Sequence, residues 1–225
     1  MTLDLILLVV LQKFALPLGG EAQISMVLLS HYAVLGVLLF ARRATIEPTR
    51  LLLYAAFMLL ALLANLLPDR SFSVPSLLLA AVTYAGLVPV MQIERTSYRR
   101  ILLNFQRVAA TLCLLVFFQH ACQLAGLGMP TLENIQPEAT LYHEYVYIQP
   151  LYWSSPYFKP NAIFLLEASH TSQFFAMALI LELAVFFRLR YVLLFGCGLV
   201  ATFAGTGLLL VLLSSPFWWH GCARR

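Results

Sequence analysis

The chain has 225 residues, of which 61% are apolar and 11% charged, and a formal net charge of +4 at pH 7. Soluble domains are about 45–50% apolar and about 25% charged. With a mean hydropathy of +0.85, the composition excludes a soluble globular enzyme, because too few polar side chains remain to cover its surface. Ordinary glycine and proline contents and four cysteines exclude collagen-like, disordered and disulfide-rich chains. We therefore expect an all-α, polytopic helical membrane protein.

Long apolar runs predict about seven transmembrane helices within a single membrane domain, residues 1–225. The predicted spans are 3–19, 24–41, 50–67, 74–92, 101–126, 162–187 and 190–214. Their lengths are close to the ~20 apolar residues that a helix needs to cross the hydrocarbon layer. The first run does not resemble a secretory signal peptide, because Lys13 lies within it and no basic segment precedes it.

Basic residues are distributed unevenly between the two sides of these spans. Nine arginines lie beside the loops after the predicted second, fourth and sixth helices: Arg42, Arg43, Arg50, Arg95, Arg99, Arg100, Arg107, Arg188 and Arg190. The other side has four basic residues: Arg70, Lys159, Arg224 and Arg225. Since basic residues favour cytoplasmic loops, we expect a cytoplasmic N-terminus and an external C-terminus. The arginines form no separate basic domain, so nucleic-acid binding is not expected.

One external loop, residues 127–161 between the fifth and sixth helices, is long and rich in aromatic residues. Seven aromatic side chains occur in it: Tyr142, Tyr145, Tyr147, Tyr152, Trp153, Tyr157 and Phe158. Tyrosine and tryptophan favour the membrane–water interface, so an interfacial belt is one interpretation. The other is a platform that stacks on sugar rings or covers a lipid-linked substrate, with Tyr152 and Trp153 as candidate binding residues.

The densest group of polar residues lies near the outer end of the predicted sixth helix. It comprises Lys159, Asn161, Glu167, Ser169, His170, Thr171, Ser172 and Gln173. Ionisable groups within a membrane are costly and are candidates for function. At 100° per residue, Glu167, His170 and Thr171 share about a third of the helix circumference. Glu167 or His170 can accept a proton from a hydroxyl nucleophile; a hydrogen-bond cluster that only holds the bundle together is the alternative.

The other polar residues within the predicted spans are Lys13, Glu182 and three isolated side chains. Lys13 either extends its side chain to the interface or meets a substrate phosphate or Glu167. Glu182 is expected to pair with Arg188, Arg190 or another basic residue nearby. Packing partners are expected for the isolated polar residues His31, Gln119 and His120.

Small residues in the predicted seventh helix indicate close helix packing. These are Gly196, Gly198, Thr202, Gly205, Thr206 and Gly207. The alternative is that the paired glycines of residues 204–207 loosen the helix so that its backbone meets a ligand. The four cysteines form no CxxC pair, so we expect no metal site. Nucleotide-binding motifs are also absent from the sequence, and no cofactor is expected.

The stretch from Lys159 to Gly207 resembles the central region of bacterial O-antigen ligases and of O-antigen or exopolysaccharide polymerases. In that family a basic residue and a Pro-Asn type element open a helix, and a later helix ends in a Ser/Thr-Gly-Thr-Gly type signature. The first element corresponds to Lys159, Asn161, Glu167, Ser169, Ser172 and Gln173, and the second to residues 204–207. The preceding five spans and the aromatic loop resemble the family only in hydropathy.

The resemblance implies a multi-pass protein of the bacterial inner membrane that transfers a glycan from undecaprenyl diphosphate to an acceptor sugar at the periplasmic face. Its implied partners are the lipid-linked oligosaccharide, the bilayer and other polysaccharide-assembly membrane proteins. Glu167 or His170 would be the base or would orient the acceptor. Lys159 would face the diphosphate, with Arg70 and Lys13 as further cations. The implied substrate-binding residues also include Asn161, Ser169, Ser172 and Gln173.

The resemblance covers only the N-terminal to central part of such proteins. They usually have ten or more spans and a large periplasmic loop after the helix that corresponds to the seventh here, whereas this chain ends there with SSPFWWHGCARR. An incomplete copy, an enzyme half or a shortened relative is therefore expected. A non-catalytic envelope assembly or scaffold protein and a transporter subunit are the alternative functions. Clustering at one helix end and the lack of an internal repeat disfavour the transporter.

Overall fold

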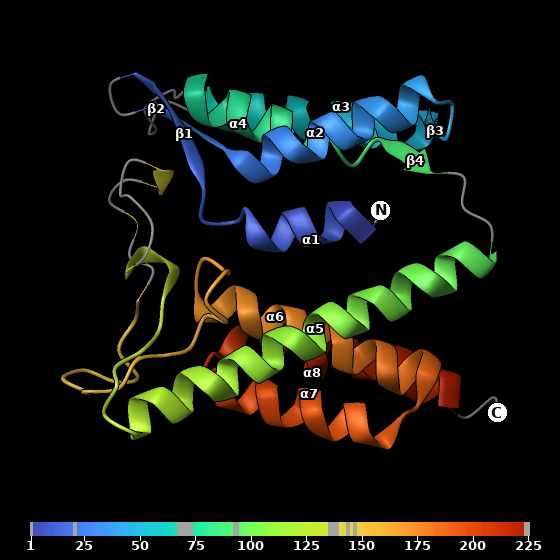
Figure 1. Ribbon diagram of the computed structural model, residues 1–225. Helices are drawn as coiled ribbons and strands as arrows, with labels where there is room; N and C mark the ends of the chain where they lie inside the picture. Colours follow the sequence, from blue (N-terminus) through green and yellow to red (C-terminus); the bar gives the residue numbers. More distant parts are fainter. Residues whose placement is uncertain are drawn as a thin grey trace. The chain divides into compact units, whose positions relative to one another are not determined.

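A computed structural model of the protein describes residues 2–19, 22–66, 74–91, 95–134, 140–142, 145 and 148–222. The described chain is mostly helical, with eight α-helices, α1 to α8, and short strands between some of them (Figure 1). It divides into two compact units. One consists of Met1–Val27 and Arg99–Arg225, and the other of Leu28–Tyr98.

The unit of Leu28–Tyr98 contains most of α2 (Met26–Phe40), together with α3 (Pro48–Asn65) and α4 (Val74–Ala85). Strands β3 (Ala44–Ile46) and β4 (Pro89–Met91) pair antiparallel. Two tyrosine hydroxyls hold the helices together at the last turns of α4: that of Tyr32 in α2 donates to the Val82 carbonyl, and that of Tyr54 in α3 donates to the Ala81 carbonyl over 3.0 Å. These bonds satisfy backbone oxygens near a helix end.

The start of α3 is capped by its own preceding residue. The carboxylate of Glu47 accepts hydrogen bonds from the backbone N–H groups of Arg50 at 2.8 Å and Thr49 at 3.2 Å. Pro48 follows as the first helical residue, where its missing N–H costs nothing. The hydrogen bond from the Arg50 amide is the main reason that the pKa of Glu47 lies below its usual value.

The other unit begins with α1 (Thr2–Val10) and a hairpin of β1 (Ala15–Gly19) and β2 (Ala22–Ser25). It continues with α5 (Arg95–Leu124, mostly within this unit), α6 (Ala168–Leu181), a π-helical turn (Glu182–Phe186), α7 (Leu189–Ala201) and α8 (Gly205–Cys222). Helix α6 packs against both α7 and α8. The buried core between the helices includes Leu112, Val116, Leu165, Phe175 and Leu199.

Two glycines allow these helices to approach closely. A Cβ atom at Gly207 of α8 would lie 2.3 Å from the Ser172 carbonyl oxygen of α6, and one at Gly198 of α7 would lie 2.4 Å from Sγ of Cys113 in α5. At Gly205 and Gly196, by contrast, nothing lies within 4 Å of an added Cβ. The close packing predicted for the small residues is therefore confirmed at two of the four glycines.

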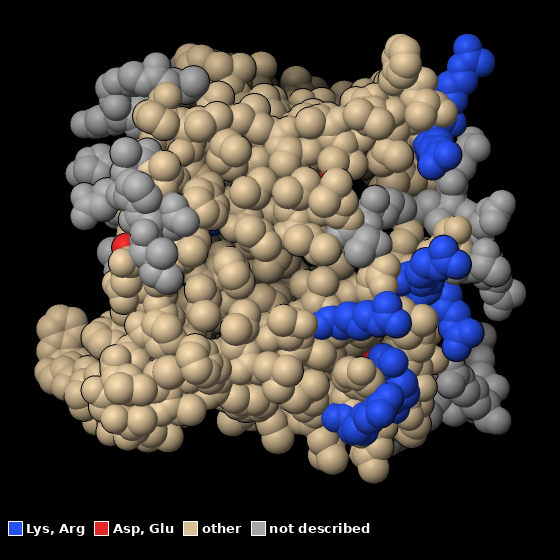
Figure 2. All heavy atoms as spheres, viewed as in Figure 1, with Lys and Arg blue, Asp and Glu red and all other residues tan. Residues whose placement is uncertain are grey.

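In the unit of Met1–Val27 and Arg99–Arg225, the described arginines lie toward one end. Figure 2 shows basic side chains over the first half of α5 and the start of α7; the described arginines of these segments are Arg99, Arg100 and Arg107 in α5, Arg188 just before α7 and Arg190 within it. Arg188 forms an ion pair with the buried carboxylate of Glu182, as the sequence predicted. Its Nε also donates to that carboxylate over 3.2 Å, and these contacts raise the pKa of Arg188.

Three helical stretches in the described chain are long and apolar enough to cross a membrane: Pro48–Asn65, Ser97–Leu124 and Ala168–Phe186. They correspond to the predicted third, fifth and sixth spans. Four other apolar helices are shorter: Met26–Phe40, Val74–Ala85, Leu189–Ala201 and Gly205–Ser215. The structure thus supports a membrane protein with at least three candidate spans and does not clearly give seven.

The predicted first and fourth spans are too long. Instead of a helix over 3–19, α1 ends at Val10 and residues 15–19 form β1. Instead of a helix over 74–92, α4 ends at Ala85 and Pro89 begins β4. A proline within each range, Pro17 and Pro89, is compatible with a strand or turn but opposes helix continuation.

The predicted sixth span, 162–187, begins too early. Residues Ala162 and Ile163 have positive φ angles of 54° and 67°, and α6 starts only at Ala168. The carboxamide oxygen of Asn161 accepts the Ile163 N–H over 3.1 Å, which stabilises a turn instead of a first helical turn.

The predicted seventh span, 190–214, is two helices. The chain reverses at residues 202–204, where Phe203 has a φ of 50° and the hydroxyl of Thr202 donates to the Leu199 carbonyl over 2.7 Å. As a result α8 starts beside the start of α6 and runs along it (Figure 1). The end of α8 therefore lies at the opposite end of this unit from the position that one continuous helix predicted.

Alanine at Gly207 is expected to lower stability by about 1–3 kcal/mol, because the new methyl group forces α6 and α8 apart. Alanine at Gly205 is expected to be neutral or to raise stability by up to about 1 kcal/mol. The pair Gly198 and Gly196 should behave in the same way. Thermal unfolding of the four purified variants in detergent checks this order, and equal effects within either pair would contradict the packing.

Acid is expected to loosen the start of α3. Because the folded-state pKa of Glu47 is lowered, its stabilising effect is present above the usual glutamate pKa and is lost as the pH falls through the folded value. Hydrogen exchange at the Thr49 and Arg50 amides, corrected for intrinsic rates, should show protection that declines with acidification. Glu47→Gln should show weaker protection with no such decline; an identical pH dependence in both proteins would refute the cap.

Candidate active site at the start of α6

Glu167 is the residue immediately before α6, and its backbone is extended, with φ −152° and ψ 169°. Its carbonyl oxygen accepts the Thr171 N–H over 3.2 Å and so begins the helix. The side chain makes no capping hydrogen bond to the backbone amides of α6. Glu167 thus differs from Glu47, which occupies the same position before α3 and uses its carboxylate as the cap. The Glu167 carboxylate is left for other interactions.

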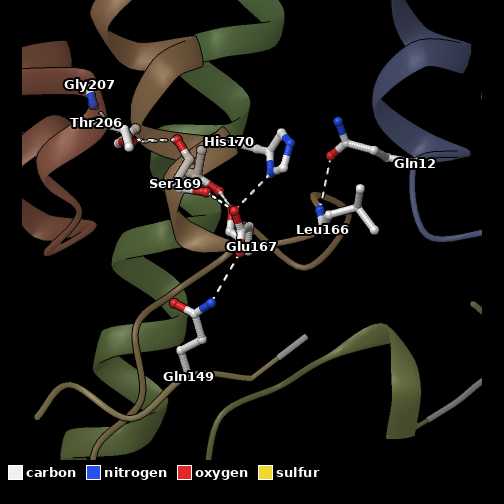
Figure 3. A network of polar contacts seen from close by, with 10 residues as sticks. Gln12, Gln149, Leu166, Glu167, Ser169, His170, Thr206 and Gly207 are labelled. Carbon is white, nitrogen blue, oxygen red and sulfur yellow. Dashed lines mark hydrogen bonds and ion pairs between the residues drawn. The ribbon is translucent and has the colours of Figure 1, made fainter. Parts of the chain in front are cut away.

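Polar side chains from two segments surround this carboxylate (Figure 3). From α6 itself, the hydroxyl of Ser169 donates to Oε1, and Nδ1 of His170 lies 3.5 Å from the same oxygen. From the loop before α6, Nε2 of Gln149 donates to Oε2 over 3.1 Å, and Tyr145 is hydrogen-bonded to the carboxylate. The side chains of Glu167 and His170 remain 24% and 38% exposed, so an incoming hydroxyl group can reach them.

Tyr145 serves this site as a hydrogen-bond donor. Burial raises the pKa of its hydroxyl, and the nearby charge of Glu167 raises it further. The phenol therefore stays protonated at physiological pH and can donate to the carboxylate. A carboxylate that is oriented in this way and lies beside an imidazole can take a proton from an alcohol.

The segment that follows α1 fastens the loop next to the site. Three consecutive residues make long-range contacts: the side-chain oxygen of Gln12 accepts the Leu166 N–H over 2.9 Å, Lys13 binds Glu133, and Phe14 forms a β-bridge with Leu141. Because Leu166 directly precedes Glu167, the first contact limits how far the catalytic candidate can move (Figure 3).

Two glutamines one turn apart on α5 hold the outer loop in place. The amide of Gln123 both donates to the Phe158 carbonyl, at 3.1 Å, and accepts the Phe158 N–H, at 2.7 Å. The amide of Gln119 donates to the Pro130 carbonyl and to the side chain of Asn161. The buried side-chain amide of each glutamine thus bonds to the backbone or a side chain of the loop in place of water.

Hydrogen bonds of serine and threonine side chains join α8 to the first turn of α6. The hydroxyl of Ser172 lies 2.9 Å from that of Thr206 and accepts the Gly207 N–H over 3.1 Å. Thr206 also donates to the Ser169 carbonyl over 3.2 Å. These bonds fix the turn that carries Ser169 and His170 against α8.

The structure brings some of the predicted site residues together. Glu167, Ser169 and His170 form one cluster. Lys159 is half-buried, and its backbone N–H donates to the carbonyl of Gln149 over 2.8 Å. Because the side chain of Gln149 binds Glu167, the backbone of Lys159 is linked to the cluster through Gln149. Among the described residues, Lys159 forms no ion pair.

Other predicted site residues have different surroundings. Asn161 and Ser172 are buried in the packing interactions just described, and Gln173 is exposed on α6. Tyr152 and Trp153, 63% and 92% exposed, lie at the tip of the turn that Gln149 and Lys159 close.

Of the two further cations predicted for the diphosphate, Lys13 does not join the cluster. Lys13 is fully buried and pairs with Glu133 at 2.7 Å, and is not exposed at an interface as one interpretation required. Arg70 lies outside the described residues.

Residues that the sequence did not single out for this site are Gln12, Tyr145 and Gln149. Gln12 was visible as a polar interruption of an apolar run, but Gln149 had no local signal. The packing roles predicted for two other residues are confirmed: Gln119 bonds to Asn161, and His120 contacts the Ala201 carbonyl at 2.7 Å.

The described part of the chain has no group of three or more histidine, cysteine, aspartate or glutamate side chains that could hold a metal ion. In comparisons with known proteins, no family model, no curated protein and no solved structure matches this chain.

Replacing Lys13 by alanine is expected to destabilise the protein by about 3 kcal/mol, because the largely buried Glu133 loses its counter-ion. The double replacement Lys13→Met with Glu133→Met should recover most of that loss, since no charge is then left unpaired. Denaturant unfolding of the three variants measures both effects. A stable but inactive Lys13→Ala protein would instead indicate contact with a substrate phosphate.

Proposed function

We propose that this chain is a polysaccharide polymerase- or ligase-like protein of the bacterial inner membrane. It transfers a glycan from an undecaprenyl-diphosphate carrier to an acceptor sugar at the periplasmic face. The single observation that supports this most is the Glu167 carboxylate, which is partly exposed, is not used to cap its helix and has His170 3.5 Å away. A base for the acceptor hydroxyl is what such a transfer requires.

The proposed orientation puts the N-terminus in the cytoplasm and the loop of residues 127–161 in the periplasm. Within the unit that contains the site, the described arginines lie in the first half of α5 and at the start of α7, whereas Glu167 precedes α6 and the loop before it bonds to the last turns of α5 through Gln119 and Gln123. Helix α5 runs between the two ends, and its stretch Ser97–Leu124 is long and apolar enough to cross a membrane. This arrangement agrees with the preference of arginine for the cytoplasmic side. The seven predicted spans are part of the same proposal with one change: the break at residues 202–204 divides the seventh into α7 and α8, so the end of α8 lies on the cytoplasmic side.

In the proposed reaction, the acceptor hydroxyl oxygen forms a bond to the anomeric carbon of the donor glycan. The bond between that carbon and the diphosphate oxygen breaks, and the electron pair leaves with undecaprenyl diphosphate. Glu167 takes the hydroxyl proton, while His170 orients the carboxylate. Lys159, the nearby cation without an ion pair among the described residues, stabilises the charge on the departing diphosphate. Trp153 and Tyr152 offer exposed rings on which sugars can stack.

The contacts of Glu167 with Gln149, Ser169 and Tyr145 favour one alternative, a non-catalytic assembly or scaffold protein in which the carboxylate only joins the loop to α6. Glu167→Gln separates the two functions. A glutamine keeps one of the two acceptor oxygens and has an NH2 group in place of the other, and it cannot take a proton at neutral pH; the protein level in the membrane then shows whether the loop still packs on α6.

Glu167→Gln is expected to reduce polymer or ligated glycan by at least about 100-fold, the usual contribution of a general base, with normal protein level in the membrane. His170→Ala should reduce it less. The assay is surface polysaccharide length and amount in cells where this chain is the sole copy. Glu47→Gln is the matched control, because it alters the other glutamate that precedes a helix and should leave the product unchanged. Unchanged polysaccharide in Glu167→Gln cells would favour the scaffold function.

A further inference from the structure

A pocket within the unit of Leu28–Tyr98 has no part in the proposed reaction. It lies between the start of α3 and the end of α4 and has a volume of about 380 Å³. That volume is within the range of ligand-binding pockets, about 300–1,000 Å³. Its lining is apolar except at one position, with Leu53 and Phe57 from α3, Tyr84 and Leu87 from α4 and the turn after it, and Arg50.

The helices around this pocket are not covered by protein within the described chain. Helix α3 has no buried residue along its length, and neither has α4. In the pocket itself, Leu53 and Leu87 are each 64% exposed. In a membrane, such surfaces contact either lipid or another helix.

Arg50 gives the pocket a polar head. Its Nη1 donates to the Leu87 carbonyl over 3.3 Å, which holds the guanidinium at the pocket wall. A guanidinium has five N–H donors in a planar fork that matches a phosphate, so donors remain for a ligand. At the other side of the lining, the rings of Phe57 and Tyr84 meet with centroids 4.6 Å apart and form an apolar wall.

Nearby charge favours an anion at Arg50. Arg42 and Arg43 are exposed in the loop that precedes α3 in the same unit. Glu47 is the acidic side chain that the structure describes in this unit, and its carboxylate is bound to the Thr49 and Arg50 backbone amides. Its charge interacts with that of Arg50 and reduces the positive potential, but the guanidinium of Arg50 forms no ion pair with a described carboxylate.

We propose that this pocket binds an anionic phospholipid, with the phosphate group at Arg50 and part of an acyl chain along Leu53 and Phe57. An arginine at the head of an apolar pocket, with two more arginines in the adjoining loop, matches a ligand that has a negative head and a hydrocarbon tail. A zwitterionic lipid would fit the apolar lining but would gain less from the three arginines. A helix from a second copy of the chain would satisfy Leu53 and Phe57 but would not need the charge.

The test uses the purified full chain in detergent, mixed with equal concentrations of phosphatidylglycerol or phosphatidylcholine, and counts bound lipid by native mass spectrometry. Wild type is expected to retain phosphatidylglycerol preferentially. Arg50→Gln should weaken its binding about fivefold, as expected for the loss of one arginine beside an anionic lipid. Leu53→Trp fills the pocket without changing the charge and should also displace the lipid.

Arg99→Gln is the matched control, because it removes an exposed arginine outside this unit and should leave lipid retention unchanged. Circular dichroism and gel filtration verify that each variant is folded. Equal retention of the two lipids by wild type, or equal binding of phosphatidylglycerol by wild type and Arg50→Gln, would overturn the proposal. A lipid-free dimer that Leu53→Trp dissociates would overturn it in favour of a protein partner.

Discussion

The hydrogen bond between Gln119 and Asn161 is the interaction on which the arrangement of the site depends. Both side chains are fully buried, and unpaired amides in an apolar interior cost several kcal/mol. Each makes a further hydrogen bond: Nε2 of Gln119 also donates to the Pro130 carbonyl, and Oδ1 of Asn161 also accepts the Ile163 N–H. The second bond, together with the bond from the Leu165 N–H to the Asn161 carbonyl, keeps residues 161–165 in a turn. Asn161 thus stabilises the turn that leads to Glu167, the residue before α6.

Close contact between α6 and α8 supplies the second constraint. Because Gly207 has no side chain, its backbone reaches the Ser172 hydroxyl, and Thr206 reaches the carbonyl of Ser169. In an apolar environment these small polar contacts and van der Waals packing stabilise helix pairs where the hydrophobic effect does not. The outer loop and α8 therefore hold the first turn of α6 from two sides. The carboxylate and imidazole consequently have a defined geometry while staying partly exposed.

Hydropathy was sufficient to predict the long helices but not the places where the chain turns. The predicted third and fifth spans correspond to α3 and α5, because an uninterrupted apolar run of this length in a membrane protein usually forms a helix. The reversal at residues 202–204 escaped prediction, since Thr202 and Phe203 are as compatible with an apolar helix as with a turn. Its signal was the cluster of glycines that follows, for which close packing was the main prediction and a loosened helix the alternative.

The site was predictable only in its local part. A spacing of three residues was enough to predict that Glu167 and His170 lie close together, and they do so even though the helix starts after Glu167. Gln12 and Gln149 come from segments distant in sequence, and no periodic pattern relates them to Leu166 or Glu167. The partner of Lys13 was missed for the same reason: Glu133 is 120 residues away.

In the proposed orientation, Glu167 and the arginines at the start of α7 lie on opposite sides of a membrane. The direct measurement is labelling of single cysteines with an impermeant maleimide in spheroplasts, in a protein whose Cys113, Cys122, Cys197 and Cys222 are replaced by alanine. Trp153→Cys in the outer loop should react in intact spheroplasts, whereas Arg190→Cys should react only after permeabilisation. Reaction of Arg190→Cys from outside, or equal labelling of both positions, would contradict the account.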